Sequence, residues 1–127
     1  MDDVMKKRIL LVDDNEDMLM LCSRELIKAG YDVATACNAK KGLEIFERQK
    51  NEIAAVVLDV LLPDMDGRRL SGKIRELDES MLIVLYSNYR NTDMLAKWGV
   101  PKDTPYVIKG NEQELIDIIR NAQQKKK

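Results

Sequence analysis

The run Ile53-Ala54-Ala55-Val56-Val57-Leu58-Asp59 is the most informative feature of the chain, because six apolar residues end abruptly in a carboxylate. A short apolar run of this kind is typical of a parallel strand that is buried on both faces. Such a strand delivers its last residue to the carboxyl edge of the sheet, where open α/β folds bind their ligands. The sequence therefore predicts a buried strand that ends at a functional edge.

Strand and helix patterns alternate five times along the chain. The predicted strands are 9–12, 31–36, 53–59, 82–87 and 106–109, and the predicted helices are 16–28, 39–49, a stretch after Gly67, a short segment 92–98, and a last helix opened by Gly110 or Asn111. This alternation predicts an α/β fold with right-handed crossovers and a parallel sheet covered on both faces. Five strands favour the doubly wound order 2-1-3-4-5, a flavodoxin-like (βα)5 arrangement whose switch point lies between the first and third strands.

Length and composition favour one globular domain over residues 1–127, with 45% hydrophobic and 34% charged residues. The 21 basic and 22 acidic residues nearly cancel, so no broad field directs the chain to nucleic acid or a membrane surface. The apolar runs are strand-sized, and the first residues lack a signal pattern. We therefore expect a cytoplasmic protein with no membrane span.

The chain contains no histidine, which excludes a Ser-His-Asp triad, a Cys-His pair and a histidine metal site. Its two cysteines, Cys22 and Cys37, form neither a disulfide framework nor a metal-ligand spacing. Cys22 falls on the apolar side of a predicted helix, and we expect both thiols to be free.

Acidic residues follow two of the predicted strands, since Asp13 and Asp14 come after 9–12 and Asp59 ends 53–59. Taken singly, such residues are often turn formers, and Asp13 or Asp14 would also suit a helix N-terminus. The predicted topology brings all three to one crevice, where repulsion costs about 1 kcal/mol per close pair. Oxygen ligands alone suit a hard cation, so the sequence predicts a Mg²⁺ site.

Two further polar residues end strands at the same edge, namely Ser87 and Lys109. Lys109 either balances the charge of the acids or binds a phosphoryl oxygen as a point charge. Ser87 is either a simple strand-end residue or a hydroxyl donor to that oxygen. A carboxylate nucleophile, Mg²⁺, a lysine and a hydroxyl together are the components of an aspartyl-phosphate site.

Over essentially its whole length the chain resembles the receiver domain of two-component response regulators, the CheY-like family. The residues that carry the resemblance are Asp13, Asp14, Asp59 within Leu58-Asp59-Val60-Leu61-Leu62-Pro63-Asp64-Met65-Asp66-Gly67, Ser87, Tyr106 and Lys109. The resemblance implies that Asp59 is phosphorylated by a sensor histidine kinase, a phosphotransfer protein or a small phosphodonor. It also implies Mg²⁺ held by Asp14, Asp59 and the backbone carbonyl of Leu61, with Asp13 binding directly or through water.

The resemblance further implies a conformational switch, in which Ser87 moves to hydrogen-bond the phosphoryl group and Tyr106 turns inward. A core-edge aromatic is the other interpretation of Tyr106. Signalling would proceed through an unknown downstream protein, with no contact to nucleic acid or membrane. The protein would be a signalling protein rather than an enzyme, although it would catalyse its own phosphorylation and dephosphorylation.

The sequence leaves two alternative functions. The first is a pseudo-receiver, a binding module that is not phosphorylated in vivo. The second is a Mg²⁺-dependent aspartyl-phosphate hydrolase, but Leu61 stands where its second acid is needed. Asp64-Met65-Asp66-Gly67 also resembles the start of a calcium loop, yet the glutamate at the twelfth position is missing, so a turn is expected.

The sequence departs from the family at several positions. Asn88 replaces a small residue and either restricts the phosphodonor or adds a hydrogen bond. Gly110 replaces a proline whose preceding bond is typically cis; a non-proline cis bond costs about 3 kcal/mol, so we predict a trans bond. In the family, the positions of Leu61 and Tyr89 flank the path of the attacking water, and two bulky side chains there predict a long-lived phosphoaspartate. A short helix 92–98 and a two-proline link predict an atypical helix 4/strand 5/helix 5 face, a possible homodimer surface.

Overall fold

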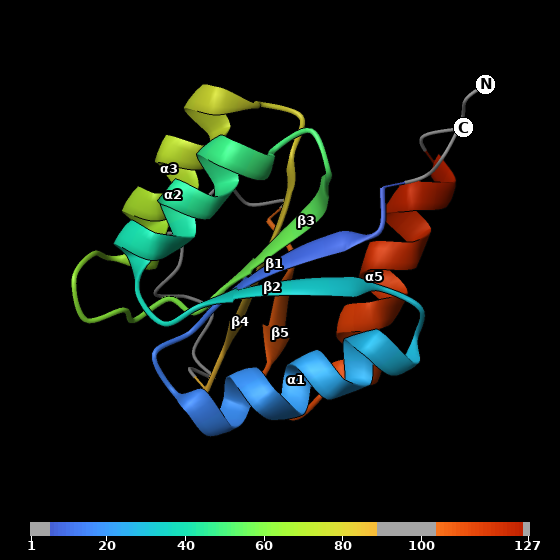
Figure 1. Ribbon diagram of the computed structural model, residues 1–127. Helices are drawn as coiled ribbons and strands as arrows, with labels where there is room; N and C mark the ends of the chain where they lie inside the picture. Colours follow the sequence, from blue (N-terminus) through green and yellow to red (C-terminus); the bar gives the residue numbers. More distant parts are fainter. Residues whose placement is uncertain (1–5, 89–103, 126–127) are drawn as a thin grey trace.

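The computed structural model describes residues 6–88 and 104–125, whose arrangement is shown in Figure 1. Its strands are β1 (Arg8–Val12), β2 (Asp32–Ala36), β3 (Ile53–Leu58), β4 (Leu82–Ser87) and β5 (Tyr106–Ile108). Its helices are α1 (Glu16–Lys28), α2 (Ala39–Gln49), α3 (Gly67–Leu77) and α5 (Glu112–Lys125). Within this part of the chain, none of the helices combines the length and apolar character needed to cross a bilayer.

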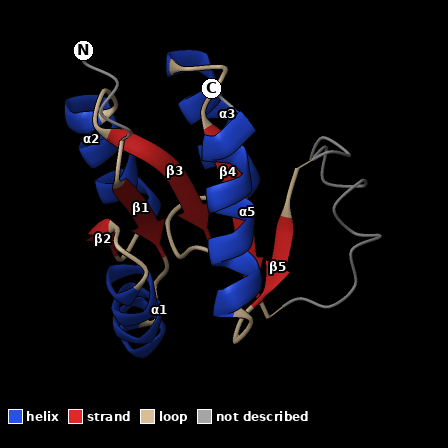
Figure 2. Cartoon of the chain, turned by 90° about the vertical axis from the view of Figure 1, so that its right-hand side faces the viewer, coloured by secondary structure: helices blue, strands red, loops and turns tan. Residues whose placement is uncertain are grey.

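The five strands form one parallel sheet in the order β2-β1-β3-β4-β5, as predicted. Helices α2 and α3 cover one face of the sheet, and α1 and α5 cover the other (Figure 1). Figure 2 shows β5 at the edge of the sheet, beside α5. The register pairs Val12 with Leu58, so the residues that follow β1 and β3 leave the sheet side by side.

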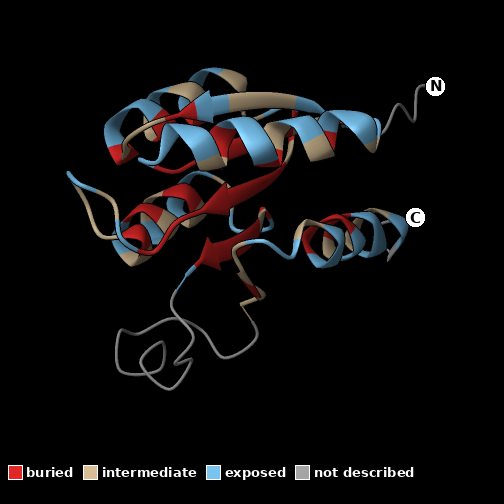
Figure 3. Ribbon diagram, turned by 90° about the horizontal axis from the view of Figure 1, so that it is seen from below, coloured by how far each residue is buried: buried red, intermediate tan, exposed pale blue. Residues whose placement is uncertain are grey.

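Two hydrophobic clusters hold the layers together, one on each face of the sheet. The first includes Leu11, Val57 and Tyr86 with Leu115 and Ile119 of α5. The second packs the other face of the same strands against α2 and α3. The central strands β1, β3 and β4 are buried, whereas the edge strand β2 is mostly exposed or half-buried. Figure 3 shows the outer helix surfaces as exposed. The central strands are apolar on both faces because helices cover both.

Local signals in the sequence define the ends of α1. Asn15 is its N-cap, and the Asn15 side chain accepts the backbone N–H groups of Asp17 and Met18. Asp13 and Asp14 therefore do not cap this helix, contrary to one interpretation of the sequence. At the other end Gly30, with φ of 100°, occupies the left-handed position that favours glycine.

The other predicted elements agree with the structure to within a residue or two, as is usual at element ends. Asn38 caps α2, and its side chain accepts the Lys41 N–H at 2.8 Å. Leu70 and Ile74 of α3 are buried, whereas Leu77 is 38% exposed because it lies in the last turn. The predicted helix 92–98 and most of the two-proline link lie outside the described residues, as does the predicted dimer face that depends on them.

Candidate functional site

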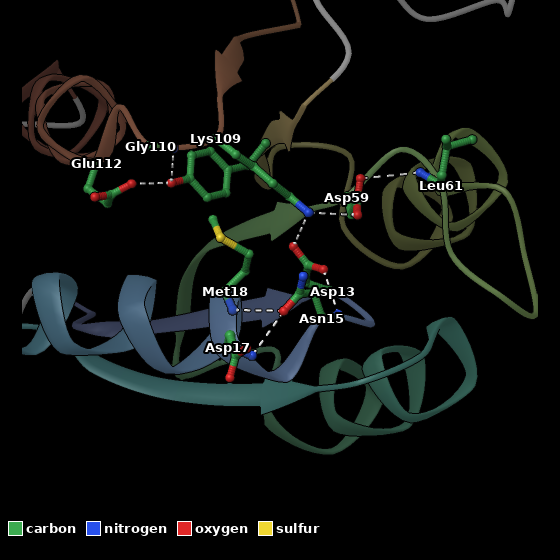
Figure 4. A network of polar contacts seen from close by, with 10 residues as sticks. Asp13, Asn15, Asp17, Met18, Asp59, Leu61, Lys109, Gly110 and Glu112 are labelled. Atoms are coloured by element: carbon green, nitrogen blue, oxygen red, sulfur yellow. Dashed lines mark hydrogen bonds and ion pairs between the residues drawn. The ribbon is translucent and has the colours of Figure 1, made fainter.

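Three aspartates meet at the carboxyl ends of β1 and β3. Asp13 and Asp14 follow β1, Asp59 follows β3, and the Asp59 N–H donates to the carbonyl of Val12 at 3.0 Å. Each aspartate places a carboxylate oxygen within 4.8 Å of the other two. Asp13 and Asp59 are nearly fully buried and Asp14 is exposed. The structure thus brings together the acids that the sequence placed at one edge. Figure 4 shows two of them, Asp13 and Asp59.

Lys109, one residue beyond β5, supplies the positive charge of the site. Its Nζ lies 2.7 Å from Asp13 Oδ2 and 3.0 Å from Asp59 Oδ2, and its side chain is only 6% exposed. Burial alone would lower the pKa of Lys109, but the hydrogen bonds to Asp13 and Asp59 outweigh burial and raise it. Lys109 is therefore a charged bridge between the ends of β1 and β3.

Asp13 connects the acidic cluster to α1. Its Oδ1 accepts the backbone N–H of Asn15, the N-cap residue, at 2.9 Å. Burial raises the pKa of Asp13 and the charge of Asp59 adds to the rise, while the hydrogen bonds from Lys109 and Asn15 only partly oppose it. The carboxylate is accordingly held ionised by Lys109 in an otherwise unfavourable environment.

A cavity of about 200 Å³ opens beside Asp59, and its lining residues are Asp59, Leu61, Ser87, Asn88 and Lys109. Ser87 is buried, Asn88 is exposed and the Leu61 side chain is 57% exposed. The Leu61 N–H donates to Asp59 Oδ1 at 3.3 Å, so both oxygens of Asp59 have polar partners. Three residues predicted for the site, Asp59, Ser87 and Lys109, therefore line one cavity.

Tyr106, the switch candidate from the sequence, is not among the residues that line this cavity. Tyr106 is half-buried and packs against the hydrophobic cluster on the α2 and α3 face. This position agrees with a core-edge aromatic, and its switch role stays a prediction. Tyr89 lies outside the described residues.

Sequence reasoning missed how the loop after β3 is held. The Gly67 N–H donates to the Val60 carbonyl at 2.8 Å, and a Cβ on Gly67 would lie 2.4 Å from the Asp59 carbonyl oxygen. Asp64 accepts the N–H groups of Ala39 and Lys40, at 2.9 and 3.0 Å, and so caps α2 from another element. Only the expected turn was visible in the sequence.

Tyr86 was also missed, because its apolar neighbours in β4 suggest a purely hydrophobic role. Its hydroxyl donates to the Glu112 carboxylate and accepts the Gly110 N–H at 2.9 Å. Burial and the hydrogen bond to Glu112 raise the pKa of Tyr86.

All peptide bonds of the described residues are trans. This confirms the prediction of a trans bond before Gly110, whose φ is 103°.

The donor set of the site fits a magnesium ion. Asp13, Asp14 and Asp59 offer only oxygen ligands, which hard divalent cations prefer, and exposed Asp14 leaves room for water. Two of the three carboxylates already contact Lys109, so a bound cation would share them with the ammonium group.

Comparison with known proteins matches residues 9–120 to the response regulator receiver domain. PhoP of Bacillus subtilis, an alkaline phosphatase synthesis transcriptional regulatory protein, is 39% identical over 72 residues, which are 57% of this chain and 29% of that protein. The receiver protein CpdR of Brucella abortus is 31% identical over 104 residues, covering 81% and 84% of the two chains. The crystal structure of response regulator TrrA from Thermotoga maritima, in complex with Mg²⁺ and BeF, has a TM-score of 0.78 at 31% identity, covering 91% and 97%. The chain thus spans less than a third of PhoP.

Proposed function

Because the chain belongs to the family of response regulator receiver domains, we propose that Asp59 accepts a phosphoryl group in a Mg²⁺-dependent reaction. The observation that carries the proposal is the buried Asp59 carboxylate, which shares one cavity with Lys109 and Ser87. A purely structural aspartate needs no cavity beside it. The phosphorylated protein then signals in a two-component system by contacts with other proteins.

In the proposed reaction an Asp59 carboxylate oxygen attacks the phosphorus of the donor. A P–O bond forms while the bond between phosphorus and the donor breaks, and a phosphohistidine donor leaves as imidazole and takes up a proton. Lys109, already 3.0 Å from Asp59, offsets negative charge on the transferred group. Ser87 lines the same cavity, and in this proposal its hydroxyl donates to the product.

Asp14, Asp59 and the carbonyl of Leu61 would hold Mg²⁺, with Asp13 binding directly or through water. The ion supplies charge neutralisation for an acidic nucleophile that meets an anionic donor. The clustered oxygen ligands support this assignment. We propose a sensor histidine kinase or phosphotransfer protein as the donor. In this proposal the chain is a signalling protein that catalyses only its own phosphorylation and dephosphorylation.

Intact-protein mass after incubation with Mg²⁺ and acetyl phosphate tests the proposal. We expect one added phosphoryl group in the wild type, and none in Asp59→Asn or without Mg²⁺. If acetyl phosphate leaves the mass unchanged, titration with beryllofluoride, which imitates a phosphoryl group, separates a donor-selective receiver from a pseudo-receiver. Failure of both would favour the pseudo-receiver function.

A further inference from the structure

We propose that the Tyr86 hydroxyl positions Lys109 by fixing the turn that follows it, an inference that rests on the proposed function of the site. Tyr86 immediately precedes Ser87 in β4, and Gly110 immediately follows Lys109. The contacts that support the inference join the Tyr86–Ser87 pair of β4 to the Lys109–Gly110 pair.

Two hydrogen bonds join the pairs. The Lys109 N–H donates to the Ser87 carbonyl at 2.9 Å, and the Gly110 N–H donates to the Tyr86 hydroxyl at 2.9 Å. The first bond continues the sheet, and the second comes from a side chain. The backbone is therefore held to β4 on both sides of the Lys109 Cα atom.

The hydroxyl has a second partner that fixes its direction. It donates to the carboxylate of Glu112, the first residue of α5, and the Tyr86 side chain itself is almost completely buried. Tyr86 thus ties β4, the turn and α5 together. Figure 4 shows Gly110 and Glu112 in this network, with Lys109 extending to Asp13 and Asp59.

The hydrogen bond from Gly110 to the Tyr86 hydroxyl restricts a turn that is otherwise flexible. Gly110 adopts φ of 103°, where glycine is permitted at little steric cost, and a glycine adds freedom that must be lost on ordering. Lysine has a flexible four-carbon stem, so its ammonium is directed only as well as its backbone is fixed. A proline at position 110 has no N–H to offer, so the contact with Tyr86 depends on the residue found there.

The variant Tyr86→Phe removes only the hydroxyl oxygen. We expect its rate of phosphorylation by acetyl phosphate and its beryllofluoride affinity to fall roughly three- to tenfold, the usual effect of one hydrogen bond. Its Mg²⁺ affinity without beryllofluoride should not fall, because Asp13, Asp14 and Asp59 are unchanged. By NMR, hydrogen exchange of the Gly110 amide should accelerate.

Tyr31→Phe is the matched control. The Tyr31 hydroxyl donates to Gln123 Oε1 at 2.9 Å and has no contact with Lys109, so the same atom is removed away from the site. We expect wild-type phosphorylation and an unchanged Gly110 amide. Glu112→Ala removes the acceptor and leaves Tyr86 in the core, so it tests the inference if Tyr86→Phe does not fold. Glu112→Gln retains an acceptor for the Tyr86 hydroxyl, so its phosphorylation rate and beryllofluoride affinity should fall less than those of Glu112→Ala.

A folded Tyr86→Phe protein that loses Gly110 protection but is phosphorylated at the wild-type rate would overturn the inference. So would a loss of Mg²⁺ affinity as large as the loss of rate, because the effect would then be general. If the wild type accepts neither phosphoryl group nor beryllofluoride, the proposed function has failed. The position of Lys109 is then judged by the ¹⁵N resonance of its Nζ, which must change in Tyr86→Phe and not in Tyr31→Phe.

Discussion

The Lys109 ammonium lies 3.0 Å from Asp59 Oδ2, and both side chains are more than nine-tenths buried. Removing one partner of a buried pair is costly because the other charge is left without compensation. Asp13 shares the same ammonium at 2.7 Å. One cation therefore stabilises two buried acids from different strands.

Replacing Lys109 by methionine should destabilise the protein in the absence of Mg²⁺ by about 3–5 kcal/mol, because two buried carboxylates lose their cation. Mg²⁺ should then raise the melting temperature of Lys109→Met more than that of the wild type. Thermal denaturation with and without Mg²⁺ measures both effects. Equal Mg²⁺ increments in the two proteins would contradict the pairing.

The same ion pairs predict a loss of stability in alkali. The pKa of Lys109 is raised from 10.5 in the folded protein, so the unfolded chain loses this proton first as the pH rises. The contribution of Lys109 is fully present below about pH 10.5 and is lost as the pH rises through the folded value. The difference in unfolding free energy between wild type and Lys109→Met, followed to alkaline pH, should stay constant and then shrink. A difference that grew with pH would contradict the predicted loss of the Lys109 contribution in alkali.

Asp64 should contribute stability at neutral pH and lose it in acid. Its pKa is lowered from 3.8 by the hydrogen bonds from Ala39 and Lys40, so the contribution is present above about pH 4 and falls as the carboxylate is protonated. Urea denaturation of wild type and Asp64→Ala at several pH values measures it. The wild-type advantage should shrink in acid. Asp64→Asn, which keeps an acceptor but no charge, should differ from Asp64→Ala by an amount that does not change with pH.

Gly67→Ala should be destabilising by about 2 kcal/mol or more, because the new Cβ meets the backbone of Asp59 and Val60. The displaced atoms belong to the segment of the proposed phosphoacceptor, so the proposed phosphorylation should also slow. Gly72→Ala is the control, since it lies in the same helix α3 with nothing within 4 Å. It should be stabilising by about 0.5–1 kcal/mol. Equal effects of the two substitutions would rule out the close contact at Gly67.

The two cysteines should differ sharply in reactivity. Cys22 is buried, and burial raises its pKa to about 12, whereas Cys37 is partly exposed. A thiol reagent near neutral pH should label Cys37 first and Cys22 only as the protein unfolds. Mass spectrometry of the native protein should show one fast adduct, and the denatured chain should show two. Rapid double labelling of the native protein would mean that α1 opens readily.

Leu61 should slow hydrolysis of the proposed phosphoaspartate, because its bulky apolar side chain lines the cavity beside Asp59. Leu61→Asn, alone or with Tyr89→Glu, should shorten the lifetime severalfold by admitting and orienting water. Decay of the phosphorylated mass after removal of donor measures the lifetime. Variants that dephosphorylate no faster than the wild type would contradict the prediction that Leu61 slows hydrolysis.

Much of the fold could be predicted because its signals are local. Apolar runs predict the buried strands, and Asn38 and Gly30 mark helix ends through contacts within their own turns. The alternation of strands and helices, with the handedness of their connections, then leads to the observed strand order. Asp13 and Asp59 could be assigned to one site because each ends a strand at the same edge.

The tertiary structure alone decided which distant side chains make contact. Tyr86 reaches Glu112 across 26 positions of sequence, and Asp64 reaches Ala39 across 25. A tyrosine within an apolar strand and an aspartate within a turn have ordinary local explanations, so neither contact leaves a periodic signal. Local patterns in the sequence define the elements, their order and the edge where the charges gather. The packing of those elements decided that Lys109 bridges Asp13 and Asp59, and that Tyr86 holds the turn beside it, because such contacts depend on distances that no local pattern encodes.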